Sequence, residues 1–177
     1  TIQSLGNTQD FGDLTQSRCR QTGFGSITRG ICSGGRDFSG PALTNIIDFI
    51  TISSTGNATD FGDNTTTKDY VGGTSGSTRG LTASGYTPSL VNVIEYVTIA
   101  STGNAIDFGD LTQGKSKCGG CNNNVIANFV GGYVSDNIND MDFVTIASTG
   151  NAADFGDAAQ AGEYYYATSD SHGGLVN

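Results

Sequence analysis

The string "STGNATDFGD" at residues 54–63 decides the fold, because nearly the same ten residues return as "STGNAIDFGD" at 101–110 and "STGNAADFGD" at 148–157. A looser copy, "SLGNTQDFGD", occupies residues 4–13. The first aspartates of the four "DFGD" strings are Asp10, Asp60, Asp107 and Asp154. They are separated by 50, 47 and 47 residues. Self-similarity at a period in this range is typical of architectures that repeat one supersecondary unit.

Each repeat is expected to contain four short strands. The most apolar stretches, rich in Ile, Val, Phe, Tyr and Thr, lie at residues 45–53, 92–100 and 139–147. Their nearly continuous apolar character predicts strands that are buried on both faces. Strands that end in glycine are expected at 28–35, 78–85 and 125–132. A third strand is expected at the Phe of each "DFGD" and a fourth at 17–26, and four short strands per period indicate a propeller blade.

The composition restricts both the fold and the partners. Only 14% of the 177 residues are charged and 27 are glycine, which favours short strands and tight turns over amphipathic helices. The net charge of −9 argues against nucleic acid as a partner, because that affinity comes mainly from Lys and Arg that neutralise phosphates. It also argues against an anionic membrane surface. No run of 18 apolar residues is present, so no membrane insertion is expected.

Three features that recur along the chain resemble the kelch repeat of β-propellers. Strands end in glycine doublets at Gly34–Gly35 and Gly131–Gly132, with Ser84–Gly85 in the second copy. An acid and an aromatic residue stand together at Asp48–Phe49, Glu95–Tyr96 and Asp142–Phe143. Aromatic anchors follow at Phe11, Phe61, Phe108 and Phe155, where kelch repeats usually have Trp. The resemblance covers the whole chain, although the loop before the anchor is longer than in kelch repeats.

The wording "VTIASTGNAxDFGDLT" is similar to a repeat in structural and uncharacterised proteins of marine bacteriophages, which implies a virion-associated or extracellular setting. With the period and the strand pattern, the kelch resemblance leads us to expect an all-β, kelch-like β-propeller of four blades of about 47 residues. A single domain would span residues 1–177, with repeats at about 1–50, 51–97, 98–144 and 145–177 and the two ends sharing one blade. A β-solenoid and a slice of a larger propeller are the alternatives.

The repeated string has a structural interpretation of its own. Glycine provides a positive φ, Asn tolerates the left-handed region, Asp bonds its own backbone, and Phe packs under the turn. The alternative is a calcium site, because paired carboxylate oxygens are ligands that Ca²⁺ prefers. The candidate ligands are Asp10, Asp13, Asp60, Asp63, Asp107, Asp110, Asp154 and Asp157. Calcium takes six or more ligands, so carbonyls or waters would have to supply the rest.

Positions at which the repeats differ are the candidate recognition surface, because stacked sheets hold the loops on one face of a propeller rigidly. Tyrosine rings with polar neighbours bind sugars by stacking and hydrogen bonding. The candidate ligand-binding residues are Tyr164, Tyr166, Asp170, His172, Asn122 and Asn123. The competing interpretation is a tyrosine-rich inner strand in which Tyr165 is buried. His172, the only histidine, stands where earlier repeats have Arg29 and Arg79, which favours a structural role.

The four cysteines form two local pairs. Cys19 and Cys32 lie in adjacent expected strands, and Cys118 and Cys121 form a CxxC motif. We expect two disulfides, Cys19–Cys32 and Cys118–Cys121, in an oxidising setting. A zinc site that uses all four thiols is the alternative, but it would bring Cys19 and Cys118 together from different blades. A redox function is disfavoured, because no thioredoxin-like βαβ pattern surrounds the motif.

No catalytic signature is found, because the single histidine has no matched Ser or Cys motif and the repeated acids select no carboxylate pair. We therefore expect a non-enzymatic binding or adhesion module that recognises a cell-surface glycan or protein, as on a phage fibre or in a secreted lectin. The alternative is a purely structural virion or fibre subunit that self-assembles through the unpaired edges of open blades.

Overall fold

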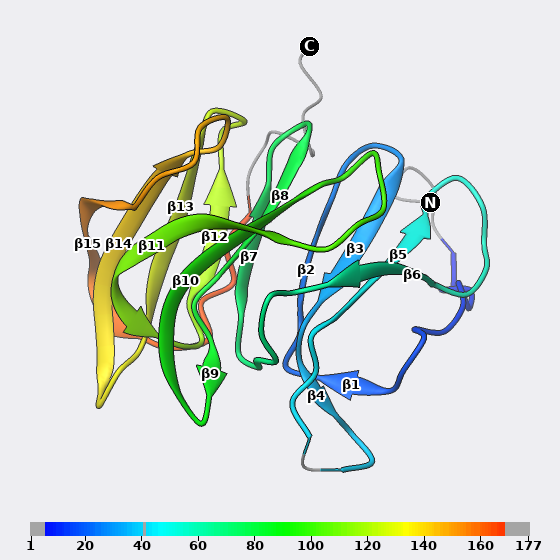
Figure 1. The fold of residues 1–177 in the computed structure, drawn as a ribbon, viewed down its shortest axis with the longest axis horizontal. Coiled ribbons are helices and arrows are strands. Elements are labelled where there is room, and N and C mark those ends of the chain that lie inside the picture. Colours follow the sequence, from blue (N-terminus) through cyan, green and yellow to red (C-terminus); the bar gives the residue numbers. More distant parts are fainter. Residues whose placement is uncertain (1–5, 41, 169–177) are drawn as a thin grey trace.

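Strands and turns make up the part of the chain that the structure, a computed structural model, describes, namely residues 6–40 and 42–168 (Figure 1). Three antiparallel sheets, each built on a meander of four strands from one region of the chain, stand side by side. No helix occurs among the described residues, and so none there is long and apolar enough to cross a membrane. The prediction of an all-β fold is confirmed.

Each sheet is a meander of successive strands. The first contains β2 (Thr22–Gly25), β3 (Arg29–Ser33), β5 (Ile46–Thr51) and β6 (Thr59–Asp63). The second contains β7 (Gly72–Ser75), β8 (Arg79–Ala83), β10 (Ser89–Thr98) and β11 (Ile106–Lys115), and the short β9 (Tyr86–Thr87) also pairs with β10. The third contains β12 (Gly119–Asn122), β13 (Ile126–Tyr133), β14 (Asn137–Thr145) and β15 (Ala153–Gly162). A separate two-stranded ladder joins β1 (Arg18–Cys19) to β4 (Arg36–Asp37).

The strands expected from the most apolar stretches are present as β5, β10 and β14. Ile94 and Glu95 point to opposite faces of β10, and both are fully buried, as expected for a strand covered on both sides. The segment 17–26, in contrast, is not one strand. It is divided into β1 and β2 because Arg20 adopts a φ of 62° between them.

Two apolar clusters fill the spaces between the sheets. The cluster between the first and second sheets contains Ile31, Ile47, Phe61, Val97, Ile99 and Ala105. The cluster between the second and third sheets contains Leu81, Ala83, Ile94, Phe108, Leu111, Cys118, Ala127, Phe129, Val144 and Ile146. The anchors Phe61 and Phe108 are each 2% exposed because they pack against the next repeat, whereas Phe155 is 57% exposed.

The repeated string forms a joint between successive repeats. We call residues 54–58, 101–105 and 148–152 the corner loops, and the four "DFGD" strings the DFGD segments. Each corner loop donates two backbone N–H groups to carbonyls of the DFGD segment that precedes it by one repeat. These bonds run from Gly56 to Phe11, Ala58 to Asp13, Gly103 to Phe61, Ala105 to Asp63, Gly150 to Phe108 and Ala152 to Asp110, at 2.7–2.8 Å.

An asparagine side chain of the corner loop completes each joint, and the glycine of the DFGD segment leaves room for the loop to approach. The side-chain oxygen of Asn104 accepts the backbone N–H of Asp63 at 3.1 Å, and Asn57 and Asn151 repeat this bond. Gly62 has a φ of +146°, and a Cβ at this position would collide with the carbonyl of Gly103. The same string therefore recurs because it is one structural joint, used between each repeat and the next.

Arginine side chains reinforce two of the joints. Arg29 donates to the carbonyl of Ile99 at 2.9 Å, and its guanidinium lies 4.5 Å from the ring centre of Phe49. Arg79 makes the same pair of contacts one repeat later, with Ile146 and Tyr96. Each arginine therefore ties its own sheet to the turn that follows the third strand of the next repeat.

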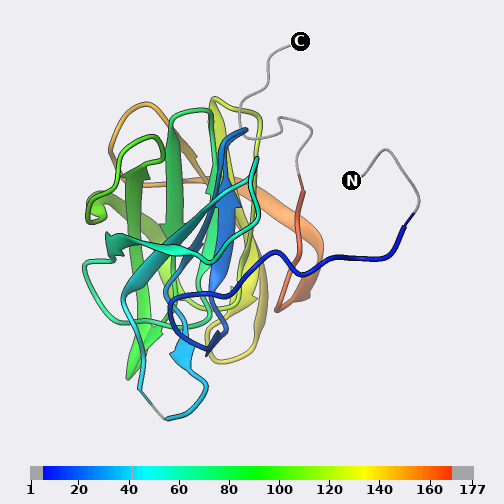
Figure 2. The same cartoon turned by 90° about the vertical axis from the view of Figure 1, so that its right-hand side faces the viewer.

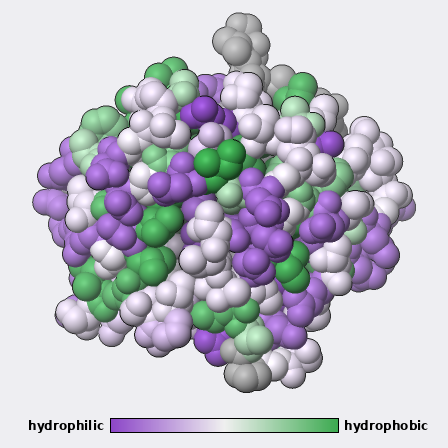
Figure 3. All heavy atoms as spheres, viewed as in Figure 1, coloured by the Kyte–Doolittle hydropathy of each residue, from purple (hydrophilic) through white to green (hydrophobic). Residues whose placement is uncertain are grey.

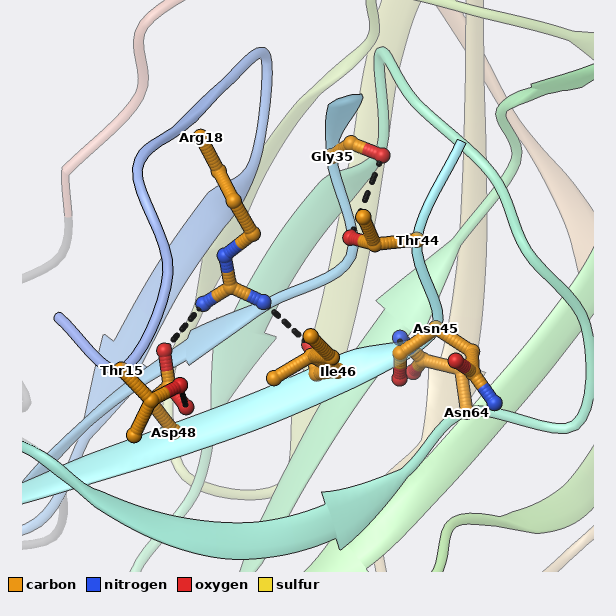
Figure 4. Close-up of polar contacts among 8 residues, drawn as sticks. All are labelled: Thr15, Arg18, Gly35, Thr44, Asn45, Ile46, Asp48 and Asn64. Carbon is orange, nitrogen blue, oxygen red and sulfur yellow. Dashed lines mark hydrogen bonds and ion pairs between the residues drawn. The ribbon is translucent and has the colours of Figure 1, made fainter. Parts of the chain in front are cut away.

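A buried ion pair lies inside each of the first three repeats. The pairs are Arg18–Asp48, Lys68–Glu95 and Lys115–Asp142, and all six side chains are 0–1% exposed. Each carboxylate also accepts the hydroxyl of a threonine three residues before the cation, namely Thr15, Thr65 and Thr112. In the first repeat the guanidinium of Arg18 bridges Asp48 and the carbonyl of Ile46 (Figure 4). The acid of the expected acid–aromatic pair is thus held by the segment that enters each sheet.

The three sheets do not close into a ring within the described residues. Residues 6–15, dark blue in Figure 1, lie at the opposite end of the molecule from β15. Figure 2 shows the same residues crossing the outer side of the first sheet. The expected sharing of one blade between the two ends involves residues 1–5 and 169–177, which lie outside the described residues.

Breaking one buried ion pair is expected to destabilise the fold strongly. Lys115→Met leaves Asp142 buried without its cation and should lower the free energy of unfolding by about 3–5 kcal/mol. The double variant Lys115→Met/Asp142→Leu should recover most of that loss, because neither charge is then buried alone. Urea unfolding measures both values. Equal stabilities for the single variant and the parent would contradict the assigned pair.

Candidate functional site

Segments from four consecutive repeats surround one pocket of about 600 Å³. We call it the axial pocket. It is lined by residues 18–23 before and within β2, by Tyr70, Val71 and Gly73 around the start of β7, by residues 117–120 around the start of β12, and by residues 164–167 after β15. These four segments occupy the same position in successive repeats. The volume lies within the range of pockets that bind small molecules in other proteins.

Equivalent residues of the four repeats are linked by backbone hydrogen bonds beside the pocket. Tyr70 donates to the carbonyl of Arg20 at 3.0 Å, Lys117 donates to Tyr70 at 2.9 Å, and Tyr164 donates to Lys117 at 2.9 Å. All four residues adopt a φ between 57° and 62°. This left-handed conformation is uncommon outside glycine and persists only where the surrounding structure enforces it. The positions of these four side chains are therefore set by the packing of the repeats.

Cationic and aromatic side chains alternate among these four residues. The guanidinium of Arg20 lies 4.5 Å from the ring centre of Tyr70. The ammonium of Lys117 lies 5.3 Å from Tyr70, 5.0 Å from Tyr164 and 4.6 Å from Tyr133. The rings of Tyr70 and Tyr164 meet edge to face at 5.9 Å. Cation–π contacts of this kind hold a charged group in place without removing its charge.

Among the described residues the lining contains Arg18, Arg20 and Lys117 and no carboxylate, although the whole chain has a net charge of −9. The side chain of Arg18 is fully buried, so Arg20 and Lys117 are the cations that the pocket exposes. The carboxylates that pair with these cations are not part of the lining: Asp48 pairs with Arg18, Asp69 with Arg20, and Glu163 with Lys117. Asp69 is shared, because the guanidinium of Arg36 also contacts it at 3.1 Å. Within the described part of the chain, the guanidinium of Arg20 donates one hydrogen bond, through Nη1, which leaves its other N–H groups for a ligand.

The charge states of the site are stable at neutral pH. Hydrogen bonding to Asp69 raises the pKa of Arg20, and hydrogen bonding to Glu163 raises the pKa of Lys117. The pKa of Tyr70 is also raised, mainly by burial and then by its hydrogen bond with Tyr164. Both cations stay charged and Tyr70 stays protonated, so the pocket presents positive charge and aromatic rings to a ligand.

The structure brings two of the expected ligand-binding residues to the pocket. Tyr164 and Tyr166 line it, and Tyr166 is 95% exposed. Tyr165 is half-buried against Gly119, Gly131 and Gly162, but residues 163–166 follow the end of β15 and form no strand, so the inner strand of the competing interpretation is not present.

The other expected ligand-binding residues are not part of the axial pocket. Asn122 lines a smaller neighbouring hollow and bonds Thr74, and Asn123 caps the turn before β13. Asp170 and His172 lie outside the described residues.

The candidate calcium ligands lie at the repeat joints. Asp10 and Asp154 each cap the backbone N–H two residues on, at 3.1 and 2.8 Å. The backbone N–H groups of Asp13, Asp63 and Asp110 are bonded by the joint asparagines. Asp60, Asp107 and Asp157 occupy the equivalent places in their own segments. Within the described part of the chain, no three acidic, histidine or cysteine side chains gather where a metal ion would be held.

The expected disulfides are not formed, and all four cysteines are free. Cys19 lies in β1 and Cys32 in β3, and these strands belong to different ladders, because the break at Arg20 places Gly23 opposite Cys32. Cys118 and Cys121 are three residues apart in extended chain, about 10 Å, which is farther than a disulfide allows. Burial raises the pKa of the Cys32, Cys118 and Cys121 thiols, which further lowers their reactivity.

Sequence reasoning missed the cations of the pocket and of the buried pairs. The signal was present, because Arg18, Lys68 and Lys115 recur with the same 50- and 47-residue steps as the DFGD segments. The same steps also separate four positions whose residue types differ, namely Arg20, Tyr70, Lys117 and Tyr164. Only the fold shows that these differing residues face one another.

The scan against protein-family models and the search of curated proteins found no match to this chain. The proposed function therefore rests on the geometry and charge of the axial pocket. On the face seen in Figure 3, apolar residues form several small groups between polar ones. The axial pocket is the feature with the most distinct chemistry.

The pair between Lys117 and Glu163 gives a testable pH dependence. The pKa of Lys117 is raised above its ordinary value of 10.5, so the folded state holds this proton more tightly than the unfolded state does. The pair's contribution to stability is full below the unfolded pKa and is lost as the pH rises through the raised value. Glu163→Gln should lower the pKa of Lys117 in an NMR titration, whereas Asp107→Asn, at an exposed acid whose carboxylate bonds no described residue, should leave it unchanged.

The cysteine geometry also gives a test. After incubation of the native protein with oxidised glutathione, alkylation and peptide mass analysis should find no disulfide between Cys118 and Cys121, because the extended chain holds them apart. Unfolded protein treated in the same way is the control and should form it. A native Cys118–Cys121 disulfide would contradict the structure of this segment.

Proposed function

We propose that the protein is a non-enzymatic binding module whose axial pocket binds a carboxylated glycan. The observation that carries this proposal is the lining of the pocket, which combines two exposed cations, Arg20 and Lys117, with tyrosines and contains no carboxylate among the described residues. Tyrosine rings bind the apolar faces of sugars, and arginine matches the geometry of a carboxylate. An acidic sugar satisfies both features at once.

The rigidity of the lining supports this proposal. The hydrogen bonds from Tyr70 to Arg20 and from Lys117 to Tyr70 fix the backbone at the left-handed positions. A ligand that binds a preformed site does not have to order it, which leaves more of the interaction energy for affinity. Tyr166, which is 95% exposed at the pocket, is the part of the lining that is free to adapt to the sugar.

A kelch-like propeller is the arrangement that we propose for the repeats around this pocket. Supporting it are the three four-stranded meanders, the contacts between their first strands β2, β7 and β12, and the gathering of four equivalent segments at one pocket. In a propeller the first strands of the blades surround a central channel. Glycosidases place two carboxylates across their cleft, and none lines the pocket in the described residues, which favours binding over hydrolysis.

The setting that we propose is extracellular or virion-associated, as the wording of the repeat implies. A role as a structural subunit of a virion or fibre is the second candidate. It is favoured by one separate observation, the exposed Phe155 on the last strand of the third sheet.

Binding of acidic oligosaccharides tests the proposal. The probes are glucuronic-acid-containing and sialylated oligosaccharides, each compared with its carboxyl-reduced form by calorimetry. The carboxylated forms should bind at least tenfold more tightly, and added salt should weaken the difference. Arg20→Gln should reduce affinity for the carboxylated forms by about 10- to 100-fold, since it removes a charge-assisted hydrogen bond.

Tyr166→Ala should weaken the binding of both forms, because its ring is part of the lining, and it should leave the fold stable, because the ring is 95% exposed. Tyr86→Ala, a partly exposed tyrosine outside the lining, is the matched control and should bind as the parent does. Equal affinity for carboxylated and carboxyl-reduced probes, or full affinity in Arg20→Gln, would exclude this function for the pocket.

A further inference from the structure

The last DFGD segment has the form of a joint, but no corner loop among the described residues contacts it. Residues 154–157 in β15 repeat the register of the earlier segments against their own sheet, with Gly156 opposite Met141 as Gly109 is opposite Ile94. At Gly62 and Gly109 a corner loop fills the space that a Cβ would occupy. At Gly156 no atom of a described residue lies within 4 Å of that position.

The anchor residue of this segment, Phe155, also lacks the apolar contacts that bury the earlier anchors. Phe155 meets Phe143 edge to face at 5.8 Å, as Phe108 meets Tyr96 and Phe61 meets Phe49 at 5.9 Å. Phe108 and Phe61 are nevertheless 2% exposed and Phe155 is 57% exposed. The difference is the contact that the next repeat supplies to the earlier anchors.

The complementary half of the joint stands at the other end of the described chain. Residues 6–8, Gly-Asn-Thr, are the counterparts of Gly103, Asn104 and Ala105. Gly6, Asn7 and Thr8 are all exposed, and none has a hydrogen-bond partner among the described residues. In Figure 1 these residues lie at the opposite end of the molecule from β15, so the two halves face away from each other.

We propose that the two halves join between copies of this chain: residues 6–8 of one copy dock on residues 154–157 of the next. By analogy with the internal joints, Gly6 donates to the carbonyl of Phe155, Thr8 donates to that of Asp157, and Asn7 accepts the N–H of Asp157. Phe155 becomes buried by the docked loop. The contact is head-to-tail, so it extends into an open chain or closes into a ring according to the rotation at each joint.

This joint lacks the arginine that reinforces the second and third internal joints. Ile126 stands at the equivalent place in the third repeat. Assembly through the joint is therefore reversible and depends on concentration. The inference does not rest on the glycan-binding proposal, because no residue of the joint lines the axial pocket.

Two variants, each of which disables one half, test the assembly. Gly156→Ala adds a Cβ that meets no described residue of its own chain but collides with a docked loop, and the φ of +126° adds local backbone strain, so its stability is measured beside its assembly. Asn7→Ala/Thr8→Pro removes one acceptor and one donor from the loop. Gln9→Ala, an exposed neighbour, is the control for the loop variant. Circular dichroism and urea unfolding establish that each variant is folded.

Sedimentation equilibrium should show a mass above 18.2 kDa that rises with concentration for the parent and for Gln9→Ala. Each half-joint variant alone should stay monomeric or associate at least tenfold more weakly. An equimolar mixture of the two variants should form dimers and stop there, because only one functional joint remains. A parent that is monomeric at all concentrations, or a Gly156→Ala variant that assembles like the parent, would overturn the proposal.

Discussion

Two backbone N–H groups of each corner loop bind two carbonyls of the DFGD segment one repeat earlier, and the rest of the structure depends on this contact. It brings Ile99 and Ala105 over Phe61, and it thereby creates the apolar cluster between the first two sheets. The buried ion pairs fix the segment that leads from one sheet into the next. The hydrogen bonds of the corner loop and the buried ion pair together fix the orientation of each sheet against its neighbour.

The axial pocket is a consequence of that constraint. Because successive sheets are related by the same joint, the segments that begin them converge, and their left-handed residues form a chain of hydrogen bonds. The scaffold repeats the backbone at these positions while the side chains vary as Arg20, Tyr70, Lys117 and Tyr164. The same fold therefore provides a fixed frame and a variable lining, a combination suited to recognition.

The sequence was sufficient to predict the all-β class, the repeat period and most of the strands, because the apolar stretches and glycine doublets are local signals. It also identified the repeated string as structural. The sequence did not predict the hydrogen bond from the backbone N–H of Asp63 to the side chain of Asn104. The two residues belong to different repeats, and both residue types are common in isolated turns. The disulfides were predicted wrongly, because the break at Arg20 shifts Cys19 out of the strand that pairs with Cys32.

Hydrogen exchange of the corner-loop amides, followed by NMR, tests the joint most directly. The loops are exposed, so an ordinary surface loop would exchange at the rate of an unprotected amide. We expect the amides of Gly56, Gly103 and Gly150 to be strongly protected because each is bonded to the preceding repeat, and Gly6 to exchange fast at concentrations where the protein is monomeric. Fast exchange at all four glycines would contradict the account, since the repeats would then not be held together by their corner loops.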